Sequence, residues 1–319
     1  MPRPVCITYD STCDLTPALL ERFQIRTVPL TIQTGERIFP DDGHYTSEDL
    51  YADFHRDGTL PKTAAVSPEQ FKEFFGAILA EGFDIVHIDI SADLSGTCQN
   101  ALIAAAELET GRIHVVDSRQ LSTGGGLLAL QGAKLRDEGM AAGDIADELR
   151  RLAPHSDTSF VLDTLEYMWK GGRCSGVAAL GANVLKLKPC LEMREGKLVV
   201  CKKYRGTMER VYRQYITERL AGKTVVEDWA FITHSGGVAE DTLAQLTELF
   251  YALKNETRDQ LGDDTLIAAM AARFNGDAGG SLDALAETDP AWFLRFTGER
   301  STHEPWPDPP VSRSFPGGR

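Results

Sequence analysis

Hydroxylated side chains gather at one junction of the sequence, between an apolar run and an alanine-rich run. Residues 83–108 read FDIVHIDI, then SADLSGT, then CQNALIAAAEL. A helix that begins near Gly96 exposes unpaired backbone N–H groups at its positive end, and Ser95 and Thr97 add hydroxyl donors. Gly96 also lets the backbone approach a ligand closely. The junction therefore predicts a site for a carboxylate or phosphate oxygen.

Ser95 is also a candidate nucleophile. A hydrolase serine needs a general base and an oriented partner, and no histidine is identifiably paired with Ser95. The G-x-S-x-G elbow, the G-x-x-x-x-G-K-[ST] loop, the G-x-G-x-x-G fingerprint and H-E-x-x-H are all absent. We therefore expect no catalytic residue, no metal and no cofactor. A serine-dependent acyl hydrolase or transferase that uses Ser95 is the alternative.

Strand and helix patterns alternate along the first half of the chain. Expected strands cover residues 5–10, 26–33, 83–90 and 111–118, and expected helices include 15–24, 47–58 with Ser47 as cap, and 67–82 with Ser67 as cap. This alternation predicts a parallel sheet with helices on both faces. Hydroxyls follow three strands, in TYDST (8–12), DISADLSGT (89–97) and VVDSRQLSTGG (115–125). Because ligands bind at the carboxyl edge of such sheets, the three loops predict a polar, uncharged binding floor, and the alternative is that each Ser or Thr simply caps the following helix.

The pattern changes near residue 156. KLKPCLEM and KLVVCKKY are short strand patterns, and the REG between them is typical of a hairpin turn. A further strand is expected over 228–234, followed by a helix. We expect an N-terminal α/β domain over 1–155, a C-terminal mixed α+β domain over 156–300 and a disordered, proline-rich tail over 301–319.

The composition of the chain bounds its class. Over 319 residues the net charge is −14, which argues against nucleic-acid binding. No apolar run approaches the roughly 20 residues of a membrane span, so no stable membrane insertion is expected. The N-terminal MPRPVCITYDS lacks a signal-peptide core, and the six cysteines form no C-x-x-C pair. We expect a cytoplasmic protein with reduced thiols, in which Cys98 is a packing residue and His87 a core or edge residue.

Residues 170–205 are basic within this acidic protein. The segment contains nine Lys or Arg residues against two Glu residues, a net charge of +7. Glycines in the Lys170–Arg173 stretch predict a tight turn that presents Arg173. Such a face suits an acidic protein or a phosphate-bearing ligand, and an ordinary solvated surface is the alternative.

A series of motifs resembles a known family. The segments ITYDSTCDL, VPLTI, PKTAAVSPEQF, ISADLSGTCQNA, VVDSRQLSTGGG, LDTLEYMWKGGRCSG and LKLKPCLEM follow in order over roughly residues 5–250. Their order and spacing resemble the DegV family of bacterial fatty-acid-binding proteins.

The resemblance implies a fold and a ligand. The implied fold has an N-terminal parallel-sheet, three-layer domain, a C-terminal mixed α+β domain and an acyl tunnel between them. One long-chain fatty acid such as palmitate lies in the tunnel, and its carboxylate is held by Thr63 of the K-T motif and Ser95 of LSGT. Together with the helix start, the expected ligand-binding residues are Thr63, Ser95, Gly96 and Thr97. A buried methylene contributes roughly 0.8 kcal/mol, so the head group needs only neutral donors.

The resemblance also implies a partner. In family members that work with a fatty-acid kinase, the kinase subunit phosphorylates the bound carboxylate to acyl phosphate. The GGR arginine and a later basic residue contribute to that encounter, and they correspond to Arg173 and Arg205. The implied function is a lipid-binding protein that is not catalytic alone. A passive lipid store or sensor without a kinase partner is the alternative.

Three features depart from the family pattern. Thr63 is followed by Ala64 and Ala65 where the family usually has a serine, and Cys98 replaces a tyrosine. A G-x-H-x-G-P-G-like segment near the C-terminus, whose histidine helps to bind the head group, is absent. No histidine can therefore be assigned to the head-group site.

Overall fold

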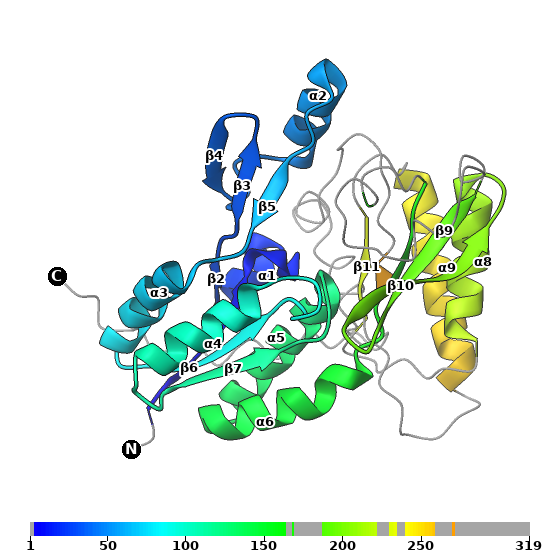
Figure 1. The fold of residues 1–319 in the computed structure, drawn as a ribbon. Helices are drawn as coiled ribbons and strands as arrows, with labels where there is room; N and C mark the ends of the chain where they lie inside the picture. The colour runs from blue at the N-terminus through cyan, green and yellow to red at the C-terminus, as the bar shows by residue number, and fades with distance from the viewer. Residues whose placement is uncertain are drawn as a thin grey trace.

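Three β-sheets organise the part of the chain that the structure describes. The computed structural model describes residues 3–163, 168, 187–221, 230–234, 240–258 and 270–271. The sheets have four, five and three strands, and Figure 1 shows the first at lower left, the second at right and the third above the first. The predicted tail over 301–319 lies outside the described residues.

The four-stranded sheet is parallel throughout, as the alternating pattern predicts. Its strand order is β2-β1-β6-β7. The strands are β1 (Val5–Asp10), β2 (Ile25–Val28), β6 (Asp84–Asp89) and β7 (Ile113–Asp117). The register pairs Tyr9 with Ile88 and Asp89 with Asp117, so the carboxyl ends of β1, β6 and β7 share one edge.

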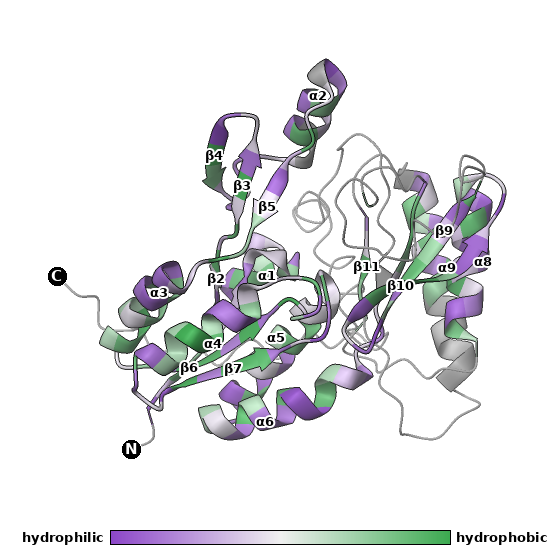
Figure 2. Ribbon diagram, in the orientation of Figure 1, coloured by the Kyte–Doolittle hydropathy of each residue, from purple (hydrophilic) through white to green (hydrophobic). Residues whose placement is uncertain are grey.

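Helices cover both faces of this sheet, because its strands are apolar on both sides. One face packs against α1 (Pro17–Arg22), α5 (Thr123–Asp137) and α6 (Ala142–Leu152), and the other against α3 (Pro68–Ala80) and α4 (Thr97–Glu107). Successive residues alternate between the two cores: Ile7 points to the first and Cys6 to the second. Figure 2 shows α6 with hydrophobic and hydrophilic positions interleaved, as a helix half-buried against a sheet requires.

The three-stranded sheet corrects one expected strand. The range 26–33 is two strands in different sheets, β2 and β3, separated at Pro29. Proline has no N–H to offer a ladder, which favours a break there. The projecting unit consists of β3 (Thr31–Thr34), β4 (Arg37–Pro40), β5 (Lys62–Ala64) and helix α2 (Ser47–Asp57).

The cap of α2 is also one residue from the expected position. Thr46, not Ser47, is the N-cap, and its side chain accepts from the Asp49 backbone N–H while the Asp49 side chain accepts from the Thr46 N–H. This reciprocal capping box requires an acceptor side chain three positions after the cap; Thr46 has Asp49 there, whereas Ser47 has Leu50. Ser67 caps α3 as expected: its hydroxyl accepts from the Gln70 backbone N–H, and the Gln70 side chain accepts from the Ser67 N–H.

The five-stranded sheet is mixed, in the order β10-β9-β8-β12-β11. Its antiparallel part confirms the predicted hairpin. Within the range 228–234, where a strand is expected, the described strand is β11, which covers Ile232–Thr233. The elements are β8 (Ser159–Val161), β9 (Lys188–Arg194), β10 (Lys197–Tyr204), β11 (Ile232–Thr233), β12 (Met270–Ala271), α8 (Met208–Leu220) and α9 (Glu240–Arg258), with short 3₁₀ turns at Ser11–Cys13 and Ala153–His155. An apolar cluster joins α8 and α9 to this sheet.

Candidate ligand-binding site

The loop after β6 forms the hydroxylated junction that the sequence singles out. Helix α4 begins at Thr97, and Gly96 occupies its N-cap position with no side chain to cap the helix. The Ser95 hydroxyl accepts from the Thr97 backbone N–H at 3.2 Å and lies 2.8 Å from the Thr97 hydroxyl. Thr97 is buried, Ser95 is half-buried and Gly96 is exposed. Ser95, Gly96 and Thr97 are therefore brought together at a helix start that can bind an anion.

The two neighbouring loops use their hydroxyls inside the protein. Ser118, after β7, accepts from the Tyr9 hydroxyl at 3.3 Å and from the Gln120 backbone N–H at 3.1 Å. The Ser122 hydroxyl donates to Asp14, and after β1 the Ser11 hydroxyl donates to Asp41. Ser11 is half-buried, as is Ser95, but its hydroxyl is bonded to Asp41, so the expected floor of three loops reduces to the β6 loop, where the hydroxyls contact only each other and the backbone at the start of α4.

Thr63 lies on a different sheet from Ser95. It occupies β5, is exposed, and pairs with Ile32 across the ladder. The Asn100 side chain in α4 donates to the carbonyl of Val66, three residues after Thr63, at 2.8 Å. This bond ties the segment that follows β5 to the first turns of α4. Among the described contacts, no hydrogen bond joins Thr63 to Ser95.

Apolar side chains line the side of the β6 loop that faces the five-stranded sheet. Leu94, next to Ser95, and Leu121 pack on a cluster from β8, β9 and β10 that includes Phe160, Leu162, Leu191, Met193 and Leu198. The polar junction therefore adjoins a buried apolar cluster, and an amphiphilic ligand requires polar and apolar groups side by side in this way.

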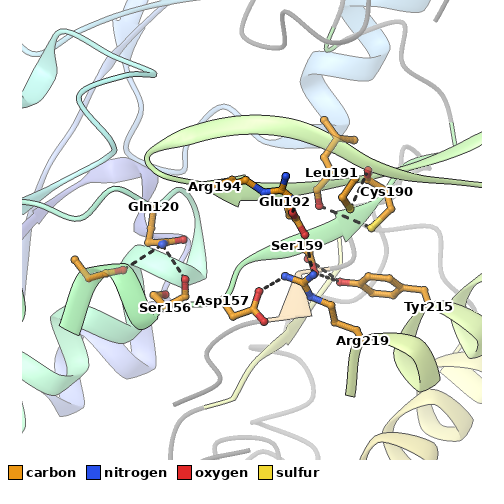
Figure 3. A network of polar contacts seen from close by, with 12 residues as sticks. Gln120, Ser156, Asp157, Ser159, Cys190, Leu191, Glu192, Arg194, Tyr215 and Arg219 are labelled. Atoms are coloured by element: carbon orange, nitrogen blue, oxygen red, sulfur yellow. Dashed lines mark hydrogen bonds and ion pairs between the residues drawn. The ribbon is translucent and has the colours of Figure 1, made fainter. Parts of the chain in front are cut away.

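A direct hydrogen bond holds the β9–β10 turn against the same loop. The Ser91 hydroxyl donates to the Gly196 carbonyl at 2.7 Å. Gly196 has φ +82°, and a Cβ there would lie 2.8 Å from the Asp93 carboxylate. Figure 3 shows a contact between the loop after β7 and the segment before β8, in which the Gln120 side-chain amide donates to the Ser156 carbonyl at 2.9 Å. The β9–β10 turn therefore needs glycine at position 196, both for its positive φ and for the close approach to Asp93.

Two buried carboxylates lie beneath the site, and the sequence patterns did not identify them. Asp10 and Asp89 are both fully buried. Asp10 accepts from the Ile90 backbone N–H at 2.9 Å and from the Thr12 backbone N–H at 2.8 Å, so it links the loops after β1 and β6. Burial, reinforced by the charge of Asp89, raises the pKa of Asp10 from 3.8 to about 6. Each of these carboxylates ends a strand and is followed two positions later by a hydroxylated residue, Thr12 after Asp10 and Ser91 after Asp89. That shared pattern is the sequence signal that could have identified them.

His87 and Cys98 have the packing roles that the sequence predicts. His87 is fully buried; its ring contacts the Thr8 hydroxyl at 2.8 Å and the Asp89 carboxylate at 3.0 Å. Burial raises the pKa of the Cys98 thiol, so this residue is not an activated nucleophile. Neither side chain is a hydrogen-bond partner of Ser95.

The basic segment is partly neutralised by residues outside it. Lys188 pairs with Asp163, and Lys202 pairs with Glu218 at 2.6 Å. Arg205 follows β10 and is exposed, as is Lys203. Arg173, its predicted turn and Cys174 lie outside the described residues. Summed charge along the sequence therefore overstates the free positive charge of this face.

No group of three or more His, Cys, Asp or Glu side chains in the described part of the chain is arranged to hold a metal ion. None of the described helices is long and apolar enough to cross a membrane.

Comparison with known proteins assigns the chain to a family. The profile of the DegV family of uncharacterised proteins matches residues 4–263. The chain belongs to the DegV family. A DegV domain-containing protein of Clostridium perfringens is 34% identical over 205 residues, which cover 64% of this chain and 74% of that protein. One from Deinococcus radiodurans is 28% identical over 88% of this chain and 99% of that protein.

Solved DegV structures share the fold. A DegV family protein from Thermus thermophilus, described by its fatty acid binding, superposes with a TM-score of 0.69 at 29% identity, over 85% of this chain and 92% of that chain. DegV from Bacillus subtilis superposes with a TM-score of 0.67 at 21% identity, over 85% of this chain and 93% of that chain. At this identity the likeness supports the fold alone. The resemblance read from LSGT and its companion motifs is thereby confirmed.

Proposed function

We propose that this DegV protein binds one long-chain fatty acid such as palmitate, with its carboxylate at Ser95, Gly96 and Thr97 and its alkyl chain along the apolar cluster beside Leu94. The observation that carries the proposal is the adjacency of neutral donors and apolar side chains in one loop. The fatty acid binding described for the Thermus thermophilus relative supports it. Thr63 supplies a second hydroxyl from the segment that Asn100 ties to α4.

Neutral donors suit this ligand energetically. Each buried methylene contributes about 0.8 kcal/mol, so a long chain supplies most of the affinity. The head group then needs hydrogen bonds only to replace those it loses to water. The Ser95 and Thr97 hydroxyls and the N–H groups at the start of α4 provide them without a cation. A carboxylate that is not paired with a cation also remains available for reaction.

The contacts of Ser95 favour binding over acyl hydrolysis. Its hydroxyl partners are the N–H and hydroxyl of Thr97, and the buried His87 is occupied by Thr8 and Asp89. A serine nucleophile requires a base within hydrogen-bond reach. The isolated chain is therefore expected to turn over no acyl ester or thioester, and a rate abolished by Ser95→Ala would contradict this.

Lipid extraction tests the binding proposal directly. The purified chain is denatured, and the released lipid is identified and quantified by mass spectrometry. A fatty acid near one equivalent per chain is expected, or saturable uptake of palmitate by delipidated protein. The absence of both would remove the proposal.

The finer proposal is that the chain presents its bound carboxylate to a fatty-acid kinase subunit, which forms acyl phosphate. Arg205, exposed after β10, and Arg173 would contact the kinase. Adding a fatty-acid kinase and ATP to the loaded protein should yield acyl phosphate, and Arg205→Glu should slow its formation while lipid still binds. Arg151→Glu, on the exposed side of α6, is the matched control. Unchanged phosphorylation in Arg205→Glu would refute the docking role, and no acyl phosphate at all would favour a passive store or sensor.

A further inference from the structure

Two cysteines face each other across the hairpin of β9 and β10. The ladder pairs Val200 with Leu191 and then Lys202 with Cys190, so Cys201 is the extra residue of a β-bulge. In a bulge two residues oppose one residue of the partner strand, which places Cys201 as well as Lys202 against Cys190. The Cys201 thiol donates to the Cys190 carbonyl at 3.4 Å.

The two thiols differ in exposure and acidity. Cys201 is exposed and Cys190 is buried. The neighbouring Cys190 side chain lowers the pKa of the Cys201 thiol, and Arg219 acts in the same direction, against partial burial and the charge of Glu192. The neighbouring Cys201 side chain, together with burial, raises the pKa of Cys190. Cys201 is thus the thiol that ionises first and that a solute can reach.

The other described cysteines lack this combination. Cys6, Cys13 and Cys98 are all buried. Burial raises the pKa of Cys6 to about 11 and that of Cys13 to about 12, and it raises that of Cys98 as well. Among the five cysteines in the described ranges, reactivity is therefore concentrated at the Cys190–Cys201 pair.

We propose that Cys190 and Cys201 are an oxidisable dithiol that a peroxide closes to a disulfide across the β9–β10 ladder. The Cys201 thiolate attacks the O–O bond of hydrogen peroxide, forming a sulfenic acid and releasing hydroxide, which takes up a proton as water. The Cys190 sulfur then attacks the Cys201 sulfur; the S–S bond forms, the S–O bond breaks, and the leaving hydroxide combines with the Cys190 proton as a second water. The two thiols lose two electrons and the peroxide gains them. An added dithiol reverses the reaction.

The ladder geometry accommodates the bond. Opposed residues of antiparallel strands have Cα atoms about 4.5–5.5 Å apart, within the roughly 4.4–6.8 Å that a disulfide spans. Cys190 packs in the cluster under α8 with Tyr204 and Tyr215, whereas its neighbour Leu191 points to the opposite face, toward Leu94. The disulfide therefore lies on the face of the hairpin away from the ligand-binding loop. This inference does not depend on the proposed function.

Peptide mapping of the oxidised full-length chain tests the proposal. The protein is treated with hydrogen peroxide, remaining thiols are alkylated, and trypsin is added without reductant. Trypsin cuts after Lys186, Arg194, Lys197 and Lys202, so the expected product joins residues 187–194 to residues 198–202. The joined pair should account for most of the chain and disappear with dithiothreitol. An unreactive pair, or Cys201 joined to any other cysteine, would overturn the proposal.

Single variants separate the roles of the two thiols. Cys190→Ser should leave a sulfenic acid at Cys201 that dimedone traps, and Cys201→Ser should lose both the trap and the disulfide. Cys6→Ala, at a buried thiol of the parallel sheet, should oxidise like the wild type. Equal peroxide consumption by Cys201→Ser and wild type would contradict the assignment.

Discussion

The loops after β6 and β7 leave neighbouring strands at the same edge, yet they use their hydroxyls differently. Asp89 and Asp117 end the two strands side by side. In the β7 loop Ser118 and Ser122 are both buried and hydrogen-bonded within the protein, whereas the half-buried Ser95 hydroxyl of the β6 loop contacts only Thr97. A hydroxyl marks a ligand site only when the fold leaves it available.

Backbone conformation explains the difference. In the β7 loop Arg119 and Ser122 have φ near +54°. Asp14, which accepts the hydrogen bond from the Ser122 hydroxyl, has φ +49°. Non-glycine residues adopt such values at a cost of roughly 1–3 kcal/mol, which local hydrogen bonds offset. In the β6 loop Gly96 has φ −73°, so no hydroxyl is needed to hold a strained turn.

The largest effect is expected at Asp10, which holds the Ile90 N–H at the start of the β6 loop. Its pKa is raised from 3.8 to about 6 by burial and Asp89, so the folded state binds the proton more tightly than the unfolded state. The free energy of unfolding should therefore fall by about 3 kcal/mol as pH rises from the unfolded-state pKa of 3.8 to above the folded-state pKa of about 6. Urea unfolding from pH 4 to 6.5 should show a flatter profile in Asp10→Asn. If stability depended on pH equally in the wild type and in Asp10→Asn, Asp10 would be excluded as the source of that pH dependence.

Gly125→Ala tests the structural role of the β7 loop. A Cβ at Gly125 would lie 1.8 Å from the Tyr9 hydroxyl, the group that donates to Ser118. Overpacking at this contact should destabilise the protein by about 1–3 kcal/mol. Gly76→Ala, in α3 with open space around the position, is the control and should stabilise by about 0.5–1 kcal/mol. Equal unfolding midpoints for the two variants would show that α5 does not need this close packing.

Ser95→Ala tests the ligand role of the β6 loop. Loss of a hydrogen bond to a charged carboxylate costs about 1.5–3 kcal/mol, so palmitate affinity should fall roughly 10- to 100-fold by isothermal titration. Ser118→Ala, in the β7 loop, should lower stability and leave affinity within about twofold. The comparison fails if both variants lose affinity equally.

Thr63→Val should have the smallest effect. Thr63 is exposed on β5, where water competes for its hydroxyl, so an approximately fivefold loss of palmitate affinity is expected. Thr31→Val, on the adjacent strand β3, is the matched control. Affinities that agree between Thr63→Val and wild type would remove Thr63 from the site.

The sequence predicts well what depends on local patterns. The alternation of strand and helix patterns predicted the parallel sheet, glycine and hydroxyl spacing predicted the start of α4 near Gly96, and REG predicted the β9–β10 turn. It predicts poorly what depends on distant partners. Asp163 and Glu218 neutralise Lys188 and Lys202 from outside the basic segment, and the burial of Asp10 follows from the neighbouring strand.

A crystal structure of the palmitate complex tests the central claim most directly. The account predicts a carboxylate oxygen within about 3.2 Å of the Ser95 hydroxyl, with the alkyl chain against Leu94 and Met193. An alkyl chain bound elsewhere, or side chains that fill the apolar cluster while Ser95 contacts Thr97 alone, would contradict it.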